Sequence, residues 1–215
     1  MTWDGTGTPI PSGPGYSRTK LQAINEVLEA SGRRHVNALD TGGSSEAGQA
    51  ERVLDRISAQ IQAKGWYENT EDGGGTGIEM VPDGSKHITV DADVLFIDTV
   101  GLSVVKNVAV RNGRLYDLDN QTDEFDDSVY VKIVRELDFA DLTMGIQRLI
   151  IARAAQIFQR RRTEQVSRDL FLRDEMIAAE RDAGQSDQET ADRNVLQTAH
   201  AASILGTPYD VHPRR

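Results

Sequence analysis

The sequence contains no cysteine among its 215 residues, so disulfide bonds and thiolate metal sites are excluded. It also lacks any uninterrupted apolar run approaching the roughly 18 residues that a membrane-spanning helix needs. The first residues, Met1 to Pro9, carry neither the basic nor the apolar stretch of a secretory signal. We therefore expect a chain that is neither secreted nor bound to a membrane, and that suits the reducing cytoplasm.

Signatures of catalysis and of cofactor binding are also missing. The serines include no Gly-x-Ser-x-Gly elbow, and the glycine run at 73–77 is not followed by the Gly-Lys-Ser/Thr of a phosphate loop. The acidic segment that starts at Asp117 resembles a calcium loop, but Thr122 and Ser128 stand where such a loop needs glycine and glutamate. The histidines, which are isolated and show no HExxH spacing, are His35, His87, His200 and His212. We therefore predict no catalytic, cofactor-binding or metal-binding residue.

The net charge of −10 is concentrated in the middle of the chain. Residues 66–137 hold fifteen acidic and six basic side chains, whereas residues 138–182 hold eight of each. A surface as acidic as that of residues 66–137 repels phosphate, so we do not expect this stretch to grip nucleic acid. Such a surface still suits a channel through which DNA slides, because repulsive walls do not hold it.

Two segments near the N-terminus have the apolar periodicity of helices. The first spans about residues 19–30 and ends at Gly32, a natural left-handed cap. The second begins near Ser44 or Ser45 and ends at Gly65, with its apolar residues on one face. We expect these two helices to pack antiparallel.

Residues 66–137 have the pattern of short antiparallel strands. Strands are predicted over 87–93 and 94–100, and residues 129–135 alternate as another strand. The pair Asn112-Gly113 lies between two strand-like runs and predicts a two-residue type I′ hairpin. This stretch therefore reads as a β insertion between helices.

Helical periodicity returns at Asp138, which together with Asp141 resembles a capping box. The helix over about residues 142–158 is apolar around much of its circumference, so it is predicted to be central. A further helical stretch ends at Gly184, and a last amphipathic segment covers 187 to about 205.

These elements predict an α+β fold: a discontinuous helical bundle with an inserted antiparallel β domain and flexible termini. The predicted organisation is a proline- and glycine-rich arm over residues 1–18, a bundle built from 19–65 plus 138–184, a β domain over 66–137, and a C-terminal helix and tail over 185–215. The arm is predicted to be flexible because its prolines and glycines prevent a helix or a core.

Three collinear blocks carry a resemblance to a known family. They are Ala23-Ile-Asn-Glu-Val-Leu-Glu-Ala-Ser-Gly32, Ala50-Glu-Arg-Val-Leu-Asp-Arg-Ile-Ser-Ala-Gln-Ile-Gln-Ala-Lys-Gly-Trp66, and Asn112-Gly-Arg-Leu-Tyr-Asp117 continuing to Leu137. With the helix that follows, these blocks span roughly Leu21 to Arg181. The sequence resembles the tail tubular protein A family, the adaptor or gatekeeper of short-tailed bacteriophages of the autographivirus type.

The resemblance implies a structural, non-enzymatic tail adaptor of the virion, assembled in the host cytoplasm. In this family the adaptor is a ring, dodecameric, that is seated under the portal and presents its other face to the nozzle protein. Packaged DNA leaves through the centre without sequence-specific binding. A ring of this kind implies an exposed apolar side on the bundle, where neighbouring subunits pack.

The residues Arg160, Arg161 and Arg162 form the only dense basic cluster of the sequence. They are candidates for contact with the portal, with a neighbouring subunit or with DNA phosphates. The alternative is a solvated helix face paired with Glu164 and Asp169.

Two further features are candidate contact sites. The loop of Gly73, Gly74 and Gly75 is predicted to be a mobile tip that touches a nozzle subunit. Trp66 is either an interface anchor or a core residue where the bundle meets the β domain, and the usual burial of tryptophan favours the core position.

Two other functions are open to the sequence. One is a tail-borne polysaccharide hydrolase that uses an acid pair of the β region, such as Asp91 and Asp93. Acid pairs at this spacing arise from composition alone in so acidic a stretch, and no motif with a mechanism accompanies them. The other is a helical interaction protein of the cytoplasm that is unrelated to phages.

Overall fold

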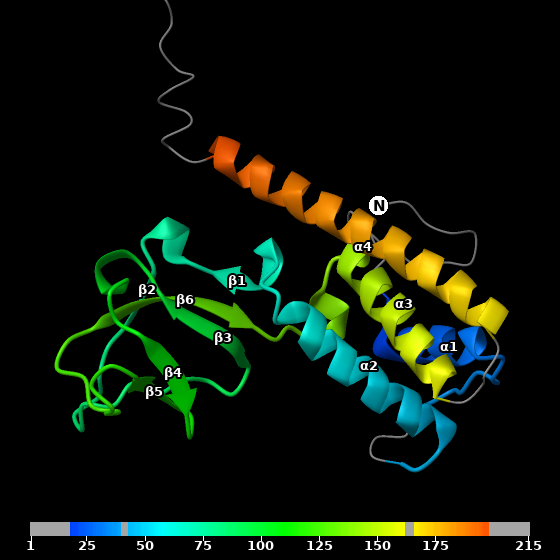
Figure 1. The fold of residues 1–215 in the computed structure, drawn as a ribbon, viewed down its shortest axis with the longest axis horizontal. Coiled ribbons are helices and arrows are strands. Elements are labelled where there is room, and N and C mark those ends of the chain that lie inside the picture. Colours follow the sequence, from blue (N-terminus) through cyan, green and yellow to red (C-terminus); the bar gives the residue numbers. More distant parts are fainter. Residues whose placement is uncertain (1–17, 40–42, 162–165, 198–215) are drawn as a thin grey trace, which may run out of the picture.

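The computed structural model of the chain describes residues 18–39, 43–161 and 166–197. The predicted arm, apart from Arg18, and the last part of the predicted tail lie outside the described residues. The fold has two parts that lie side by side (Figure 1). One part is a bundle of four helices, and the other is the β region, residues 66–137, which enters the chain between the second and third helices. The predicted α+β fold with a discontinuous bundle and an antiparallel insertion is confirmed.

The first two helices begin where the sequence places their caps. Helix α1 (Lys20–Ala30) starts after Thr19, whose hydroxyl accepts the Gln22 N–H at 3.2 Å while the Gln22 side chain accepts the Thr19 N–H at 2.8 Å. Helix α2 (Glu46–Gln62) starts after Ser45, which caps the Gly48 N–H. Both helices bury their apolar stripe in the bundle.

Helix α3 (Met144–Arg160) is the centre of the bundle, as predicted, because it packs against α1, α2 and α4. Ile150 and Ala154 are fully buried on it, and Phe158 is 2% exposed. The predicted capping box at its start is wrong. Residues Phe139–Asp141 form a separate 3-10 turn, the Asp138 side chain makes no capping bond, and α3 begins only after Thr143.

Helix α4 (Val166–Gln197) is a single helix, so the predicted helix end at Gly184 is wrong. One glycine inside a helix costs only about 1 kcal/mol, and packing around it keeps the helix continuous. Ala179 and Ala183 are buried against the bundle. Gly145 of α3 lies so close to Ala183 that a side chain there would approach the Ala183 Cα at 3.3 Å.

The β region contains two antiparallel sheets. The larger sheet is built around β6 (Val129–Arg135), which pairs with β3 (Val94–Thr99) and with two short strands, β1 (Thr70–Glu71) and β2 (Ile78–Met80). The smaller sheet is the hairpin of β4 (Val108–Arg111) and β5 (Arg114–Asp117). A second apolar core lies in this region; its members are Ile88, Val90, Ile97, Leu115, Phe125, Val129, Val131 and Ile133.

Most of the predicted strands are confirmed, and one is wrong. The hairpin is confirmed, with Asn112 at φ 53° and Gly113 at φ 71°, the left-handed pair that a type I′ turn requires. Strands β3 and β6 are also confirmed. The strand predicted over 87–93 is wrong, because His87 and Thr89 form single bridges to two different segments and no continuous ladder. Strands β1 and β2 are too short to show a period in the sequence.

Candidate interaction surfaces

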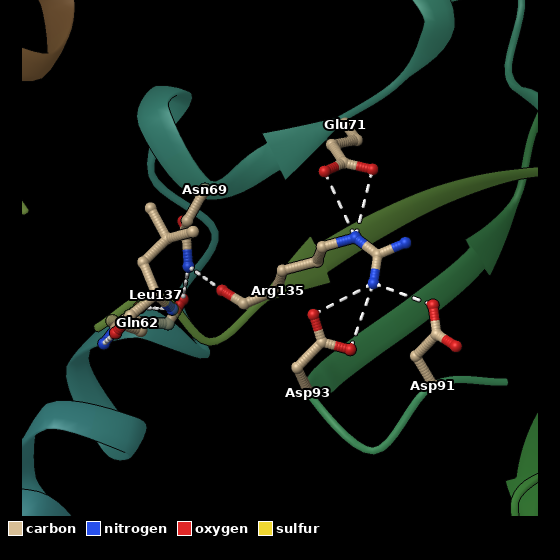
Figure 2. Close-up of polar contacts among 7 residues, drawn as sticks. All are labelled: Gln62, Asn69, Glu71, Asp91, Asp93, Arg135 and Leu137. Atoms are coloured by element: carbon tan, nitrogen blue, oxygen red, sulfur yellow. Dashed lines mark hydrogen bonds and ion pairs between the residues drawn. The ribbon is translucent and has the colours of Figure 1, made fainter. Parts of the chain in front are cut away.

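The bundle and the β region are joined by a buried hydrogen-bond network (Figure 2). The Gln62 side chain is fully buried at the end of α2. Its Nε2 donates to the Leu137 carbonyl at 3.0 Å, and its Oε1 accepts the Leu137 N–H at 2.7 Å. Asn69 Nδ2 donates to the carbonyls of Gln62 at 3.0 Å and Arg135 at 2.8 Å. The end of α2 is therefore held against the point where β6 leads back to the bundle.

Trp66 lies within this joint. Its indole N–H donates to the Ile61 carbonyl at 2.8 Å, and its backbone N–H donates to Asn69 Oδ1 at 2.9 Å. The ring is half-buried and packs against the apolar core of the bundle. Trp66 thus connects the two parts of this chain, and part of its ring remains accessible.

Arg135 gathers three carboxylates at the edge of the larger sheet, as Figure 2 shows. Its Nη1 donates to Asp93 at 3.0 Å and to Asp91 at 3.1 Å, and its Nε donates to Glu71 at 3.1 Å. The hydrogen bonds that Arg135 donates to Asp93 and then to Glu71 raise the pKa of Arg135 above its usual value. Asp91 and Asp93, the acid pair of the hydrolase alternative, therefore share one guanidinium group that holds β1 and β3 on β6.

The glycine loop, Gly73–Gly75, is an exposed 3-10 turn between β1 and β2. The Asp72 side chain accepts the Gly74 N–H at 3.0 Å and defines the start of the turn. A side chain built at Gly74 or Gly75 would meet no atom within 4 Å. The structure thus places this loop at the surface, where another protein has room to approach.

An apolar loop, Gly101–Val105, lies beside the glycine loop. Leu102 is 88% exposed, Val104 66% and Val105 82%. The loop is nevertheless fixed, because Ser103 is buried and its hydroxyl accepts the Tyr130 N–H at 3.0 Å. Gly101 has φ 58°, and a side chain there would come within 2.8 Å of the Thr76 carbonyl, next to the glycine loop.

This apolar loop was missed by sequence reasoning. Three solvent-exposed aliphatic side chains on one fixed loop are unusual for a surface that binds no partner. The available signal was the run Leu-Ser-Val-Val directly after a strand, where a polar turn is the norm. The exposed apolar side expected on the bundle is present on α4, at Leu170, Phe171 and Ile177.

An arginine groove of about 860 Å³ is lined by residues of α2, by Phe158 of α3 and by residues that follow α1 and α3. The start of α2 and the end of α3 lie on the side of the bundle away from the β region (Figure 1). The arginines of the groove come from three elements: Arg33 follows α1, Arg52 and Arg56 lie one turn apart on α2, and Arg161 follows α3. The remaining lining residues are Gln49, Val53 and Phe158, so no acidic residue of the described chain lines the groove.

The predicted basic cluster is only partly contained in this groove. Arg161 lines it, Arg160 is exposed on the last turn of α3, and Arg162 lies outside the described residues. Sequence reasoning missed Arg52 and Arg56. Their four-residue spacing on a predicted helix was the signal that could have found them.

Within the described ranges, no helix combines the length and the apolar character needed to cross a bilayer.

Comparison with known proteins identifies the family. A family model described as "Tail tubular protein" matches residues 21–202. The chain is also 35% identical over 123 residues to the tail tubular protein A of Klebsiella phage KP34. That alignment covers 57% of this chain and 62% of the relative, so it spans less than two thirds of the relative's length. The hydrolase alternative is not retained, because the matching family is structural. The chain therefore belongs to the tail tubular protein family, which comprises structural, non-enzymatic components of the bacteriophage tail.

Proposed function

We propose that this chain is the tail adaptor, and that its copies form a ring which connects the portal to the nozzle and lines the DNA exit channel. The ring, a dodecamer by family resemblance, is assembled in the host cytoplasm. The observation that carries the proposal is the amount of apolar surface left in water on both parts of the chain. Leu102 and Val105 are more than 80% exposed in the β region, and Phe171 is 69% exposed on α4. Surfaces of this kind belong to proteins that are covered by partners.

The joint between the two parts supports a mechanical role. Gln62 and Asn69 use their amides to bind backbone groups of both parts. Buried hydrogen bonds of this kind fix orientation, because each group left without a partner would cost roughly 1–3 kcal/mol. A force that acts on the β region is therefore passed on to the bundle, because the joint holds the two parts in a fixed orientation.

The two neighbouring loops of the β region are the proposed contact with the nozzle protein. The glycine loop offers an uncrowded backbone, and the apolar loop beside it offers aliphatic side chains. Arg160–Arg162 remain proposed contacts with the portal, a neighbouring subunit or DNA, and Trp66 remains a candidate interface anchor. The acidic surface of the β region favours DNA that slides without being held.

Negative-stain microscopy of the purified full-length chain, alone and mixed with its portal, tests the ring. We expect closed rings at high concentration or on the portal. A chain that stays monomeric at every concentration, even beside the portal, would overturn the proposal.

The nozzle contact is tested by titrating the nozzle protein onto assembled rings. Leu102→Ser should weaken nozzle binding by roughly tenfold, since burying a leucine side chain contributes about 1.5–3 kcal/mol. Val81→Ser is the matched control, because Val81 is 67% exposed but lies outside both loops. Equal nozzle binding by the two variants would contradict the assignment of the apolar loop.

A further inference from the structure

Opposite charges lie on α1–α3 and on the β region. The segments that carry α1, α2 and α3, 18–39, 43–65 and 138–161, hold eleven basic and seven acidic side chains, whereas α4 holds four basic and eight acidic ones, so the positive excess of the bundle is confined to α1–α3. The β region has an excess of nine negative charges. Figure 1 shows the two parts toward opposite ends of the longest axis, with the start of α2 and the end of α3 on the side of the bundle away from the sheets. A head-to-tail contact between copies is therefore electrostatically favoured over a contact between like ends.

The arginine groove is lined by four arginines and by no acidic residue of the described chain. Arg33 approaches Glu46 at 3.5 Å, and Arg52 donates to the Gly43 carbonyl at 2.7 Å. The guanidinium groups of Arg56 and Arg161 form no hydrogen bond or ion pair with any residue that the structure describes. Four guanidinium groups around one groove repel each other, and an acidic occupant would offset that repulsion.

The densest acidic segment is the acidic loop, residues 117–127, which joins β5 to β6. It contains six acidic residues and no basic residue. The loop is ordered from within: the Asp117 carboxylate accepts the Asn120 N–H at 2.9 Å, and Phe125 is 3% exposed. Glu124 and Asp127 are exposed, and their carboxylates form no hydrogen bond or ion pair with the described residues. These two carboxylates are available to a partner.

We propose that the arginine groove of one copy receives the acidic loop of the next copy. The helix ends that line the groove and the β5–β6 connection that forms the acidic loop lie on opposite sides of the folded molecule (Figure 1). One copy cannot bring them together, so the contact forms between two copies. A contact between two different surfaces is heterologous, and it closes into a ring when the rotation between copies allows. This inference rests on the proposed ring and names the surfaces that build it.

The chemistry of the groove favours an anionic occupant. Guanidinium groups bind carboxylates, and also phosphates, through paired hydrogen bonds. Val53 and Phe158 are only 4% and 2% exposed, so the arginine and glutamine side chains form the accessible lining of the groove. The acidic loop of a second copy supplies carboxylates of the matching charge, and DNA binding is an outcome that the test below separates.

Sedimentation velocity of the full-length chain at several salt concentrations tests the proposal. The double variant Arg52→Glu/Arg56→Glu should weaken self-association by roughly tenfold or more, and so should Glu124→Lys/Asp127→Lys. Combining the two pairs in one chain restores opposite charges and should restore association. Association of the wild type should weaken as salt rises from about 0.05 to 0.5 M, because salt screens exposed charges.

The control is Lys64→Glu/Arg111→Glu, which makes the same change in net charge at exposed positions outside the groove, the acidic loop and the exposed apolar face of α4. Each variant must show the thermal unfolding curve of the wild type, so that weaker association reports the surface and not a loss of folding. The control is expected to associate like the wild type.

The outcomes separate this inference from the proposed function. If the wild type never associates, even beside its portal, the ring itself fails. If rings form and Arg52→Glu/Arg56→Glu forms them equally well, the ring stands and the groove assignment is wrong. The assignment is also wrong if that variant keeps self-association while losing either portal binding or binding to a fluorescent DNA duplex.

Discussion

The joint at Gln62 gives the sharpest test of how the two parts are held together. We consider Gln62→Met, which keeps the volume of the buried side chain and removes both of its hydrogen-bonding ends. The substitution deletes the bond from Nε2 to the Leu137 carbonyl and the bond from the Leu137 N–H to Oε1. It also deletes the bond from Nε2 to the Ser58 hydroxyl at 2.9 Å. The Leu137 N–H and carbonyl are then left without these partners.

The expected loss is roughly 1–5 kcal/mol in the free energy of unfolding, because the two stranded backbone groups cost about 1–3 kcal/mol each and the more apolar side chain returns about 1 kcal/mol. Urea unfolding followed by circular dichroism measures the total. Tryptophan fluorescence in a Trp3→Phe background follows the joint itself, because Trp66 is then the only tryptophan of the sequence and donates its indole N–H within the joint. Hydrogen exchange at the Leu137 amide should also accelerate in the variant.

Gln60→Met on the exposed face of α2 is the matched control, and it should change the free energy of unfolding by less than about 0.5 kcal/mol. A Gln62→Met protein as stable as this control, with an equally protected Leu137 amide, would refute the reasoning. It would mean that packing alone fixes the β region on the bundle.

Three other predictions concern the core, the hairpin and the acidic loop. Ile150→Ala, at a fully buried position of the central helix, should lower the free energy of unfolding by about 2–5 kcal/mol in a urea titration. Gly113→Ala should cost about 1 kcal/mol by the same measurement because Gly113 has φ 71°, whereas Gly84→Ala, at an uncrowded position without a positive φ, should cost clearly less. Hydrogen bonding, first from the Asn120 N–H, lowers the pKa of Asp117. The stabilisation from Asp117 is therefore present above its usual pKa near 3.8 and is lost as the pH falls through the lowered value, so the stability gap between wild type and Asp117→Asn should be full at pH 7 and shrink toward pH 3.

Local signals in the sequence were sufficient wherever neighbouring residues decide the structure. Thr19 and Ser45 cap helices that their own first turns complete, and Asn112-Gly113 can satisfy only a tight turn with two positive φ angles. The central position of α3 also followed from the sequence, because apolar residues around much of its circumference need cover from several neighbours.

Other features depended on contacts between distant residues. The continuity of α4 at Gly184 is supported by buried alanines nearby that pack on the bundle, which no local propensity reveals. The segment that starts at His87 looks like a strand, yet its backbone groups bond alternately to two different segments. The arginine groove unites residues more than one hundred positions apart, from Arg33 to Arg161, so only folding brings them together.

The length of α4 has a mechanical consequence. Thirty-two residues at about 1.5 Å each give a rod of roughly 48 Å. The rod is fastened to the bundle by Ala179 and Ala183, and Asp187 further along it accepts the Tyr67 N–H at 2.7 Å at the edge of the β region. A continuous helix bends little over such a distance, so a push on one end becomes a tilt at the other. A load applied near the end of α3 is thereby felt beside the sheets without passing through a flexible connection.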